Sequence, residues 1–200
     1  MSWLTQEELN TIGISSLGKN VLISNKASLY NCGKIRIGNN VRIDDFCVLS
    51  AGDGGILLGD YIHIAVYSSL IGAGEIVMSD FSGISSRVSI YSSNDDYSGM
   101  SLTNPTVPNR FRNVLNRSVI LGKHVIIGNG SIVLPGVTLE EGVAIGALSI
   151  VNKDCRAFGI YAGIPARFIK ERSRDLLLLE KNIREQLQCA NQSGENKDDD

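Results

Sequence analysis

Residues 121–155 read LGKHVIIGNGSIVLPGVTLEEGVAIGALSIVNKDC, and an aliphatic residue returns at every sixth position. A small or β-branched residue follows each of these aliphatics four positions later. An amphipathic helix would need an apolar spacing of about 3.6 residues, and an ordinary strand a spacing of about 2. The period of six fits neither, and it predicts a parallel β-helix in which each six-residue unit forms one short strand and one corner. The aliphatics are Leu121, Ile127, Val133, Leu139, Ile145 and Val151.

Three such units would close one triangular coil, and successive coils would stack at the strand spacing of about 4.8 Å. The aliphatic side chain points into a narrow prism, and the small residue fills the space beside it. Gly122, Gly128 and Gly146 directly follow an aliphatic, where a corner favours a residue without a Cβ atom. A β-sandwich with coincidental spacing is the alternative, but six units in unbroken register favour the β-helix.

The same period runs through most of the preceding chain. Its register residues are Leu17, Ile23, Leu29, Ile37, Ile43, Leu49, Leu58, Ile64, Leu70, Ile76, Ile84 and Ile90. Insertions interrupt it at 30–34, at 51–55 and around Phe81, and we interpret them as bulged corners that point away from the prism. From Tyr91 to about Ser118 the period fails entirely. A loop of this length in a compact domain is usually functional or disordered, and its aromatic and aliphatic residues favour function.

The two ends of the chain predict helices. Thr5 with Glu8 forms a capping-box pattern, so a short cap helix is expected within residues 1–16. Residues 17–172 form the β-helix domain with the loop excursion at 91–118. An amphipathic helix is expected over 173–190, as an end cap or a trimer contact, with an apolar stripe of Leu176, Leu179, Ile183 and Leu187. The acidic residues 191–200 predict a disordered tail.

Composition excludes several classes of protein. A net charge of −2 and a sequence pI of about 5.7, without a sustained basic face, argue against a nucleic-acid partner. The start, MSWLTQEELN, lacks the features of a signal peptide. The run Leu176–Leu179 is too short to span a membrane. The four scattered cysteines form no metal or disulfide pattern, which favours a reducing cytoplasm; they are Cys32, Cys47, Cys155 and Cys189.

The repeat, the long insertion after the Ile90 unit and the ending YAGIPAR at 161–167 resemble the left-handed β-helix acyltransferases of the hexapeptide-repeat superfamily. The resemblance covers about residues 15–172. It implies a left-handed coil, although general topology rules favour right-handed crossovers. It also implies acyl-CoA or acetyl-CoA as co-substrate, and a homotrimer with its sites between subunits.

Three shorter motifs are similar to the N-acyltransferases that act on nucleotide-linked amino sugars, such as the enzyme of anthrose biosynthesis. They are YIHIAVYSSL at 61–70, SSR at 85–87 and NDDYSG at 94–99. The resemblance implies an acceptor like dTDP-4-amino-4,6-dideoxyglucose, in the biosynthesis of a surface polysaccharide or O-antigen. Which acyl group, sugar and nucleotide are used stays open at this stage.

The residue chemistry points independently to a nitrogen acceptor. A hydroxyl of very high pKa needs a general base as it attacks, and in this fold a loop histidine usually provides it. Between Tyr91 and Ser118 there is no histidine, only Asp95 and Asp96. A carboxylate is adequate for an amine, which needs only to lose the proton of its ammonium form. We therefore expect Asp95 to accept that proton, while Ser85 or Asn94 orients the amine or the thioester oxygen; the alternative for Asp95 and Asp96 is turn formation.

Further residues are candidates for acceptor binding. His63 follows from the resemblance as a substrate-side residue, although a base or a simple hydrogen-bonding partner within the stack are alternatives. The matched motifs add Arg87, Asp96 and Tyr97. His124 lies in a different coil and is interpreted as a solvated or trimer-contact residue.

The last coils predict the site for the acyl donor. Small residues there would let an extended pantetheine arm lie against the backbone; they are Gly128, Gly146, Ala147, Ala162 and Gly163. The resemblance places Pro165 near the adenine, and Arg167 and Lys170 near the phosphates of coenzyme A. Arg167 and Lys170 also belong to a basic cluster, whose alternative role is a solvated approach to the C-terminal helix.

Other functions of this scaffold fit less well. A zinc carbonic anhydrase needs three histidine ligands, and the chain has only His63 and His124, so no metal is expected. A structural or ice-binding solenoid would need a regular outward threonine ladder, which does not occur. O-acetylation of a glycan or antibiotic hydroxyl shares the fold and the donor, and it stays as the alternative. Direct transfer in a ternary complex is expected, without a covalent enzyme intermediate.

Overall fold

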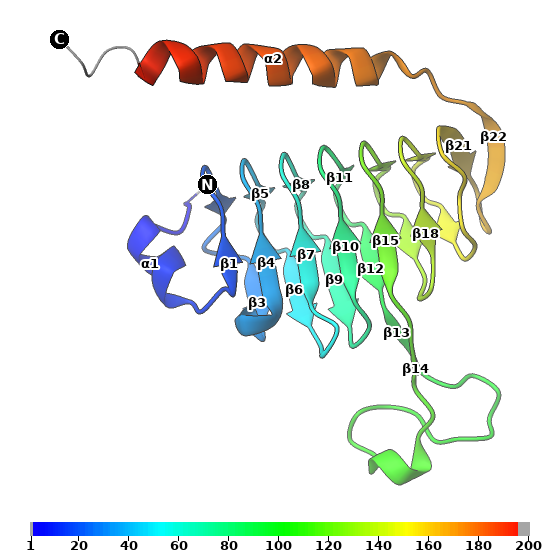
Figure 1. Ribbon diagram of the computed structural model, residues 1–200. Helices are drawn as coiled ribbons and strands as arrows, with labels where there is room; N and C mark the ends of the chain where they lie inside the picture. The colour runs from blue at the N-terminus through cyan, green and yellow to red at the C-terminus, as the bar shows by residue number, and fades with distance from the viewer. Residues whose placement is uncertain (1, 196–200) are drawn as a thin grey trace.

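A computed structural model describes residues 2–195 of the chain, with side chains described as far as residue 187. It contains a triangular prism of short parallel strands, a helix at one end, a long loop excursion and a C-terminal helix (Figure 1). The parallel β-helix predicted from the six-residue period is therefore confirmed.

Each face of the prism is one sheet with parallel pairing from coil to coil, and the last strand of the second sheet, β22, pairs antiparallel with β21. The first sheet contains β1 (Ser16–Leu17), β4 (Ile35–Ile37), β7 (Ile56–Leu58), β10 (Ile76–Met78), β15 (Val119–Leu121) and β18 (Thr138–Leu139). The second contains β2 (Leu22–Ile23), β5 (Arg42–Ile43), β8 (His63–Ile64), β11 (Gly83–Ile84), β16 (Ile126–Ile127), β19 (Ala144–Ile145), β21 (Gly159–Ala162) and β22 (Arg167–Glu171). The third contains β3 (Ser28–Tyr30), β6 (Val48–Ala51), β9 (Ser69–Gly72), β12 (Ser89–Tyr91), β17 (Ile132–Val133) and β20 (Ile150–Val151).

The register residues form the core of the prism. The stretch that carries the unbroken period has all six of its aliphatics at 3% exposure or less. Ile127, for example, pairs with Ile84 in the coil before it and with Ile145 in the coil after it. Burial of one such side chain contributes about 1.5–3 kcal/mol, so the stacked aliphatics are the main stabilising feature of the domain.

One part of the predicted register is wrong. Met78, and not Ile76, continues the row of Leu58 and Leu121. The two-residue insertion therefore lies before β10, in residues 71–75, and not around Phe81. Ile76 and Met78 are both fully buried because a three-residue strand points its first and third side chains inward. The sequence could not distinguish them for this reason.

All the insertions leave the prism at the same edge, where the third sheet passes to the first. They connect β3 to β4, β6 to β7, β9 to β10 and β12 to β15. The first contains a short 3-10 helix, η1 (Cys32–Lys34), and the last is the long excursion. The excursion begins and ends as a two-stranded antiparallel ladder of β13 (Ser93–Asn94) and β14 (Leu115–Asn116), and it contains η2 (Asn109–Phe111). The four insertions that lengthen the six-residue unit therefore all lie at this one edge of the prism.

The cap helix α1 (Gln6–Thr11) lies at the first end of the prism (Figure 1). Both hydrogen bonds of the predicted capping box form between Thr5 and Glu8. Leu9 is buried against the core, and the backbone N–H of Leu4 donates to the carbonyl of Ile23 at 2.8 Å. The helix thereby covers core residues of the first coil that would otherwise face water.

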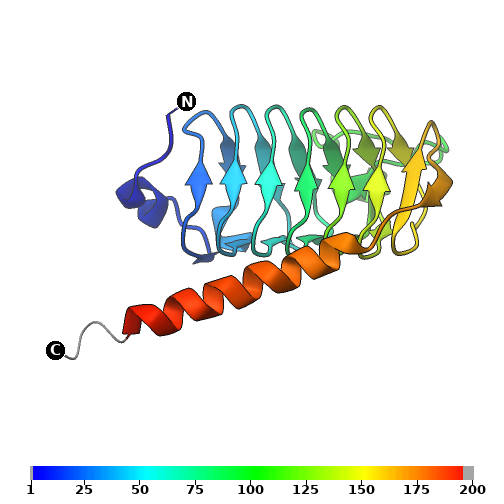
Figure 2. The ribbon, with the colours of Figure 1, turned by 90° about the horizontal axis from the view of Figure 1, so that it is seen from above.

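The C-terminal helix α2 (Asp175–Glu195) runs alongside the prism and back toward its first end (Figure 2). The expectation of an end cap is therefore wrong, because β22 reverses the chain direction before α2 begins. The helix also continues past the predicted end at residue 190; no proline occurs in that segment, and Gly194 comes only at its end. The remainder of the predicted disordered tail, residues 196–200, lies outside the described residues.

Contacts between α2 and the prism come from Leu176, Glu180 and Arg184, which share one face because they are four residues apart. The predicted apolar stripe is largely exposed in the single chain, with Leu179 at 61% and Ile183 at 42%. The helix is therefore attached to the prism mainly through charged side chains. Within residues 2–195, none of the helices is long and apolar enough to cross a membrane.

Candidate functional site

A stack of small residues runs along the corner that follows the second sheet. Because Ile84, Ile127, Ile145 and Tyr161 are in register, the residues after them lie above one another. These next residues are Ser85, Gly128, Gly146 and Ala162. The structure thus aligns the predicted Ser85 with three of the predicted donor-binding residues along one edge of the prism.

The glycines in this stack also have a packing role. A Cβ atom on Gly128 would lie 2.5 Å from the backbone nitrogen of Ala147, and one on Gly146 would lie 2.9 Å from the Cβ of Ala162. Neither distance is compatible with the stacking of the coils. Gly128 and Gly146 are therefore required by the fold itself, while Ala147 in the next corner is exposed.

The remaining predicted donor residues lie where β21 turns into β22. The backbone N–H of Gly163 donates to the hydroxyl of Ser149 at 3.0 Å, which fixes this turn on the last coil. Pro165 follows a cis peptide bond in the turn, and Arg167 and Lys170 are exposed on β22. Arg172 belongs to the same basic region. Its guanidinium is not free to bind a phosphate group, because it donates hydrogen bonds to the carbonyls of His124 and Gly142.

The loop candidates line a groove of their own, of about 590 Å³. Asn94, Asp95, Asp96 and Tyr97 come from one side of the β13–β14 ladder, and the other side is 113–116. Asp95 is half-buried at this groove, whereas Tyr97 is 86% exposed. The ladder gives the start of the excursion a fixed position relative to the prism.

Asp96 takes part in a turn, as the alternative interpretation expected. Its carboxylate accepts a hydrogen bond of 2.8 Å from the backbone N–H of Ser98. Hydrogen bonds from the side chain and backbone of Ser98 lower the pKa of Asp96 from its ordinary value. Of the two loop carboxylates, Asp95 is therefore the one without an assigned structural contact among the hydrogen bonds and ion pairs of the described residues.

His63 and Ser85 line a second groove, of about 490 Å³, on the outer face of the second sheet. Its floor is formed by β8, β11 and β16, and the N-terminal end of α2 contributes Leu176 to its wall. Arg87 lies at the next corner, where its guanidinium stacks over the ring of Tyr67 at 5.3 Å. The structure therefore brings His63 and Ser85 together but places Arg87 in a separate stack.

Sequence reasoning missed Asp44, which holds His63 in place. The Oδ2 atom of Asp44 lies 2.9 Å from Nε2 of His63, and its Oδ1 atom accepts from Nε of Arg42 at 2.7 Å. Asp44 is only 5% exposed. Since a carboxylate accepts and does not donate, His63 carries its proton on Nε2 and presents Nδ1 away from Asp44. The register did contain a signal for this contact, because it pairs Arg42 of β5, two residues before Asp44 in the chain, directly with His63 of β8.

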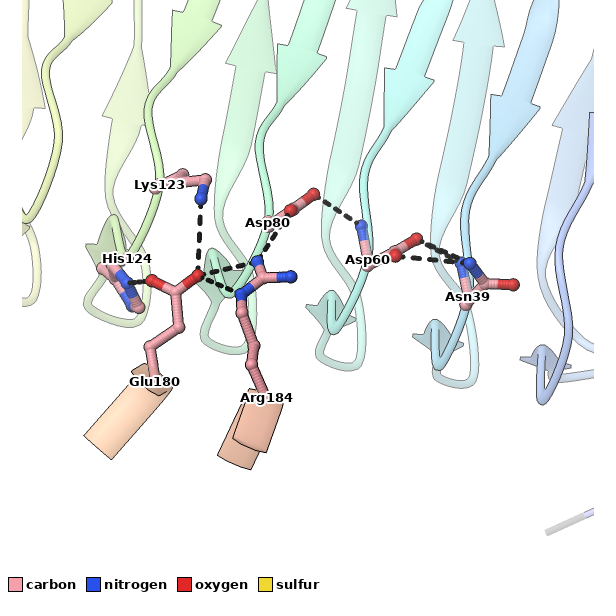
Figure 3. A network of polar contacts seen from close by, with 7 residues as sticks. All are labelled: Asn39, Asp60, Asp80, Lys123, His124, Glu180 and Arg184. Atoms are coloured by element: carbon pink, nitrogen blue, oxygen red, sulfur yellow. Dashed lines mark hydrogen bonds and ion pairs between the residues drawn. The ribbon is translucent and has the colours of Figure 1, made fainter. Parts of the chain in front are cut away.

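His124 is not the solvated residue that the sequence suggested. It is 9% exposed, and its Nε2 lies 2.6 Å from a carboxylate oxygen of Glu180 on α2 (Figure 3). Arg184 donates to Glu180 at 2.7 Å and also reaches Asp80 at 3.4 Å. Burial raises the pKa of Glu180, but hydrogen bonds from His124 and Arg184 and the charge of Lys123 outweigh it and lower that pKa to about 2. This network is how α2 is held beside the groove.

The two grooves lie on different edges of one chain. The loop leaves the prism between the third and first sheets, while Ser85 follows the second sheet, and Figure 1 shows the loop and α2 on opposite sides of the prism. Asp95 and Ser85 are therefore not brought together within a single chain. Among the described residues there is no group of three histidine, cysteine, aspartate or glutamate side chains that could hold a metal ion.

Comparison with known proteins shows which relatives this chain is similar to. It is 61% identical over 180 residues to a dTDP-4-amino-4,6-dideoxy-D-glucose acyltransferase of Escherichia coli, covering 90% of this chain and 94% of the relative. A putative lipopolysaccharide biosynthesis O-acetyl transferase of Escherichia coli, WbbJ, is 28% identical over 162 residues, covering 76% and 80% of the two chains. The sequence matches no model of a protein family.

The N-acyltransferase AntD from Bacillus cereus has the same fold. Its crystal structure with dTDP and 3-hydroxybutyryl-CoA superposes with a TM-score of 0.90 at 50% identity, covering 94% of this chain and 98% of AntD. A serine-to-alanine variant of AntD, solved with dTDP-4-amino-4,6-dideoxyglucose and coenzyme A, gives a TM-score of 0.89 at 51% identity, covering 92% and 98%.

The coil of this chain is that of the left-handed β-helix acyltransferases, with one long loop between coils. This fold, with a stack of small residues leading to Ser85, defines an acyl-CoA-dependent acyltransferase. Within that class, the chain belongs to the family of the dTDP-4-amino-4,6-dideoxyglucose N-acyltransferases. The resemblance predicted from the repeat and the short motifs is thereby confirmed.

Proposed function

We propose that this protein transfers an acyl group from an acyl-CoA to the 4-amino group of dTDP-4-amino-4,6-dideoxyglucose. The observation that carries the proposal is the 61% identity, over 90% of the chain, to an acyltransferase of that sugar. The absence of a histidine from residues 91–118 supports an amine over a hydroxyl acceptor.

The proposed reaction is a direct transfer. Asp95 accepts a proton from the sugar ammonium group, and the neutral amine then attacks the thioester carbonyl carbon. Ser85 donates a hydrogen bond to the carbonyl oxygen as negative charge develops there, and Asn94 orients the amine. The carbon–nitrogen bond forms and the carbon–sulfur bond breaks, and the proton that the attacking nitrogen loses on becoming an amide goes to the departing thiolate of coenzyme A. No covalent enzyme intermediate is needed.

The donor lies along the stack of small residues in this proposal. The pantetheine arm follows Ala162, Gly146 and Gly128 toward Ser85, and Gly163 and Ala147 border it. Pro165 lies near the adenine, and the exposed Arg167 and Lys170 meet the phosphates. His63, Arg87, Asp96 and Tyr97 are the proposed residues for the acceptor.

The proposal includes a homotrimer with its active sites between subunits. Asp95 and Ser85 lie on different edges of one chain, so the loop of one subunit would meet the Ser85 corner of the next. The exposed Leu179 and Ile183 of α2 also favour a partner surface, since such apolar patches mark contacts. Light scattering coupled to gel filtration tests this state, and a monomer that is fully active would contradict it.

A cytoplasmic location goes with this proposal. The three cysteines whose side chains are described are free thiols, as expected in a reducing compartment. The product would serve the assembly of a surface polysaccharide or O-antigen.

The test is a screen of acyl-CoAs against dTDP-4-amino-4,6-dideoxyglucose and its 4-hydroxy counterpart, with release of free thiol as the readout. The proposal expects turnover with the amino sugar and a kcat/KM at least a hundredfold lower for the hydroxy sugar, since the site lacks a strong base. Equal or better turnover with a hydroxyl acceptor would establish O-acylation, the alternative, in its place.

A further inference from the structure

A row of buried small residues lies inside the prism, beneath the corner that carries Ser85. The parallel pairing of the third sheet aligns this inward position from coil to coil. Its buried members are Cys47, Ser68, Val88, Ser131 and Ser149. The corresponding row at the corner that follows the first sheet is aliphatic apart from one serine, and it contains Val21, Val41, Ile62, Ser82, Val125 and Val143. Hydroxyl and thiol groups are therefore concentrated beneath the corner of Ser85.

Polar members of this row hydrogen-bond to the backbone of the corner in the next coil. Ser68 donates to the carbonyl of Ser85 at 3.0 Å. The same kind of bond joins Cys47 to the carbonyl of Ala65 at 3.1 Å and Ser131 to that of Gly146 at 3.0 Å. In the other row, the hydroxyl of Ser82 has no hydrogen-bond partner among the described residues. Burial inside the prism therefore does not by itself bring a hydroxyl into contact with a corner.

Ser68 connects two backbone groups of the corner that contains Ser85. Besides donating to the carbonyl of Ser85, its hydroxyl accepts from the backbone N–H of Val88 at 3.3 Å. Ser68 is only 1% exposed, so water does not compete for either bond. The two bonds span residues 85–88 from inside the prism. They restrain the peptide plane that follows Ser85, and with it the direction in which the Ser85 side chain leaves the backbone.

Packing alone does not require a hydroxyl at residue 68. Val88 occupies the same position in the next coil and is fully buried, so the prism accepts an aliphatic side chain there. The hydroxyl of Ser85 takes part in none of the hydrogen bonds of the described residues, so its position depends on the backbone. A donor to a developing oxyanion is effective when its position is fixed before the reaction. A restraint on the backbone of Ser85 meets that need.

From this geometry we infer that Ser68 is a positioning residue for acyl transfer: its buried hydroxyl holds the corner so that Ser85 is aligned with the thioester oxygen. The inference rests on the proposed function and on the role given there to Ser85. Ser68 itself touches neither substrate, because its side chain lies inside the prism. Without its hydroxyl, the carbonyl of Ser85 and the N–H of Val88 lose this shared partner, and the corner is free to shift.

The experiment is a double-mutant cycle of Ser68→Ala and Ser85→Ala, with kcat and both KM values measured for acyl-CoA and the dTDP-amino sugar. Removal of one oxyanion donor costs about 10²- to 10³-fold in kcat, and Ser85→Ala is expected to lose that much. A misplacement of about 1 Å can cost about 10²-fold, and Ser68→Ala is expected to lower kcat by about 5- to 100-fold with both KM values within about twofold. In the Ser85→Ala background, Ser68→Ala should lower kcat no further, since no hydroxyl is left to position.

Two further variants separate positioning from a loss of stability. Ser68→Cys is the conservative variant, because Cys47 makes the same kind of bond from the same row, and it is expected to recover most of the kcat lost in Ser68→Ala. Cys47→Ala is the matched control, because it removes one buried donor of the row that bonds to Ala65 and not to Ser85. Its Tm is expected to fall as in Ser68→Ala, by about 2–4 °C, while its kcat stays that of the wild type.

Several results would overturn the inference. Additive losses in the cycle, or equal losses of kcat in Ser68→Ala and Cys47→Ala, would show a general effect of the core on activity. Near-normal kcat of Ser68→Ala would show that the corner holds Ser85 without this hydroxyl. If Ser68→Ala does not fold, Ser68→Val takes its place in the cycle, since valine is the side chain found at residue 88.

Two outcomes distinguish this inference from the proposed function. Unchanged kcat of Ser85→Ala would remove the role of Ser85, and the positioning role of Ser68 with it, while acyl transfer to the amino sugar would stand. A wild-type protein that turns over no acyl-CoA with the amino sugar would refute the proposed function itself.

Discussion

His124 at a corner of the prism and Glu180 on α2 are joined by a contact of 2.6 Å across 56 residues of sequence (Figure 3). Both side chains are largely buried, with relative exposures of 8% and 11%. Arg184 bonds to the same carboxylate and extends the contact to Asp80. Asp80 in turn accepts from the backbone N–H of Asp60, so α2 is attached to a ladder of polar contacts along the coils.

Removal of the charge on Glu180 should loosen α2. The Glu180→Gln variant leaves His124 and Arg184 with a weaker acceptor, and we expect the free energy of unfolding to fall by about 1–3 kcal/mol. Thermal and denaturant unfolding measure this. Glu185→Gln, the same change in the same helix, is the control, because the ion pair of Glu185 with Lys181 is exposed and contributes little. Equal effects from both variants would contradict the assignment.

The same network should make stability depend on pH in the acid range. The pKa of Glu180 is lowered from 4.5 to about 2, so its contribution is complete above about pH 4.5 and is lost as the pH falls toward 2. The difference in unfolding free energy between wild type and Glu180→Gln should therefore shrink over this interval. A difference that stays constant down to pH 2 would show that the carboxylate is not stabilised in the folded state.

Substitution of Asp95 should affect turnover more than substitution of Asp96. A general base contributes about 10²- to 10⁴-fold to rate, and Asp95→Asn is expected to lower kcat within that range. Asp96→Asn weakens the turn at Ser98 and should lower kcat less. Steady-state kinetics with the amino sugar, together with gel filtration to verify the oligomer, provide the measurement. Near-normal turnover of Asp95→Asn across pH would reject Asp95 as the base.

A double-mutant cycle should detect the role of Asp44. Because the carboxylate of Asp44 lies 2.9 Å from Nε2 of His63, we expect Asp44→Asn and His63→Gln each to lower kcat/KM, and the double variant to lose no more than the larger single effect. Independent, additive losses would show that Asp44 influences activity by another route. Unfolding measurements are needed alongside, since Asp44 also pairs with Arg42.

The buried thiols should react slowly. Burial raises the pKa of Cys47 and of Cys155 to about 11 each, so little of either is present as thiolate near neutral pH. We expect mass spectrometry after brief treatment with a thiol reagent to find both unmodified in the native protein and modified after unfolding. Rapid modification of either thiol in the native protein would contradict the packing described for the prism.

The core could be predicted from sequence because the period of six reports directly which side chains point inward. The register at Ile76 and Met78 could not, since alternate residues of one strand are both buried and both apolar. The contact between Asp44 and His63 joins adjacent coils, so it follows only once the lengths of the insertions are known. The position of α2 depended on the reversal at β22, for which the sequence had no periodic signal.

The sequence predicted which residues belong to the candidate site, but it did not predict how the loop residues and Ser85 are arranged in space. Ser85 and the small residues stand in a row because of the register, which the period provides. The loop residues lie outside any period, so their distance from Ser85 could not be inferred from spacing.

The four insertions that leave the prism at one edge give this architecture a practical freedom. Segments of different length occur there while the other two edges keep the six-residue unit, and neighbouring insertions hydrogen-bond to one another, as the backbone N–H of Gly54 does to the carbonyl of Ala73. The segment between β12 and β15 can therefore differ in length and sequence while the corner that carries Ser85, Gly128 and Gly146 keeps its register.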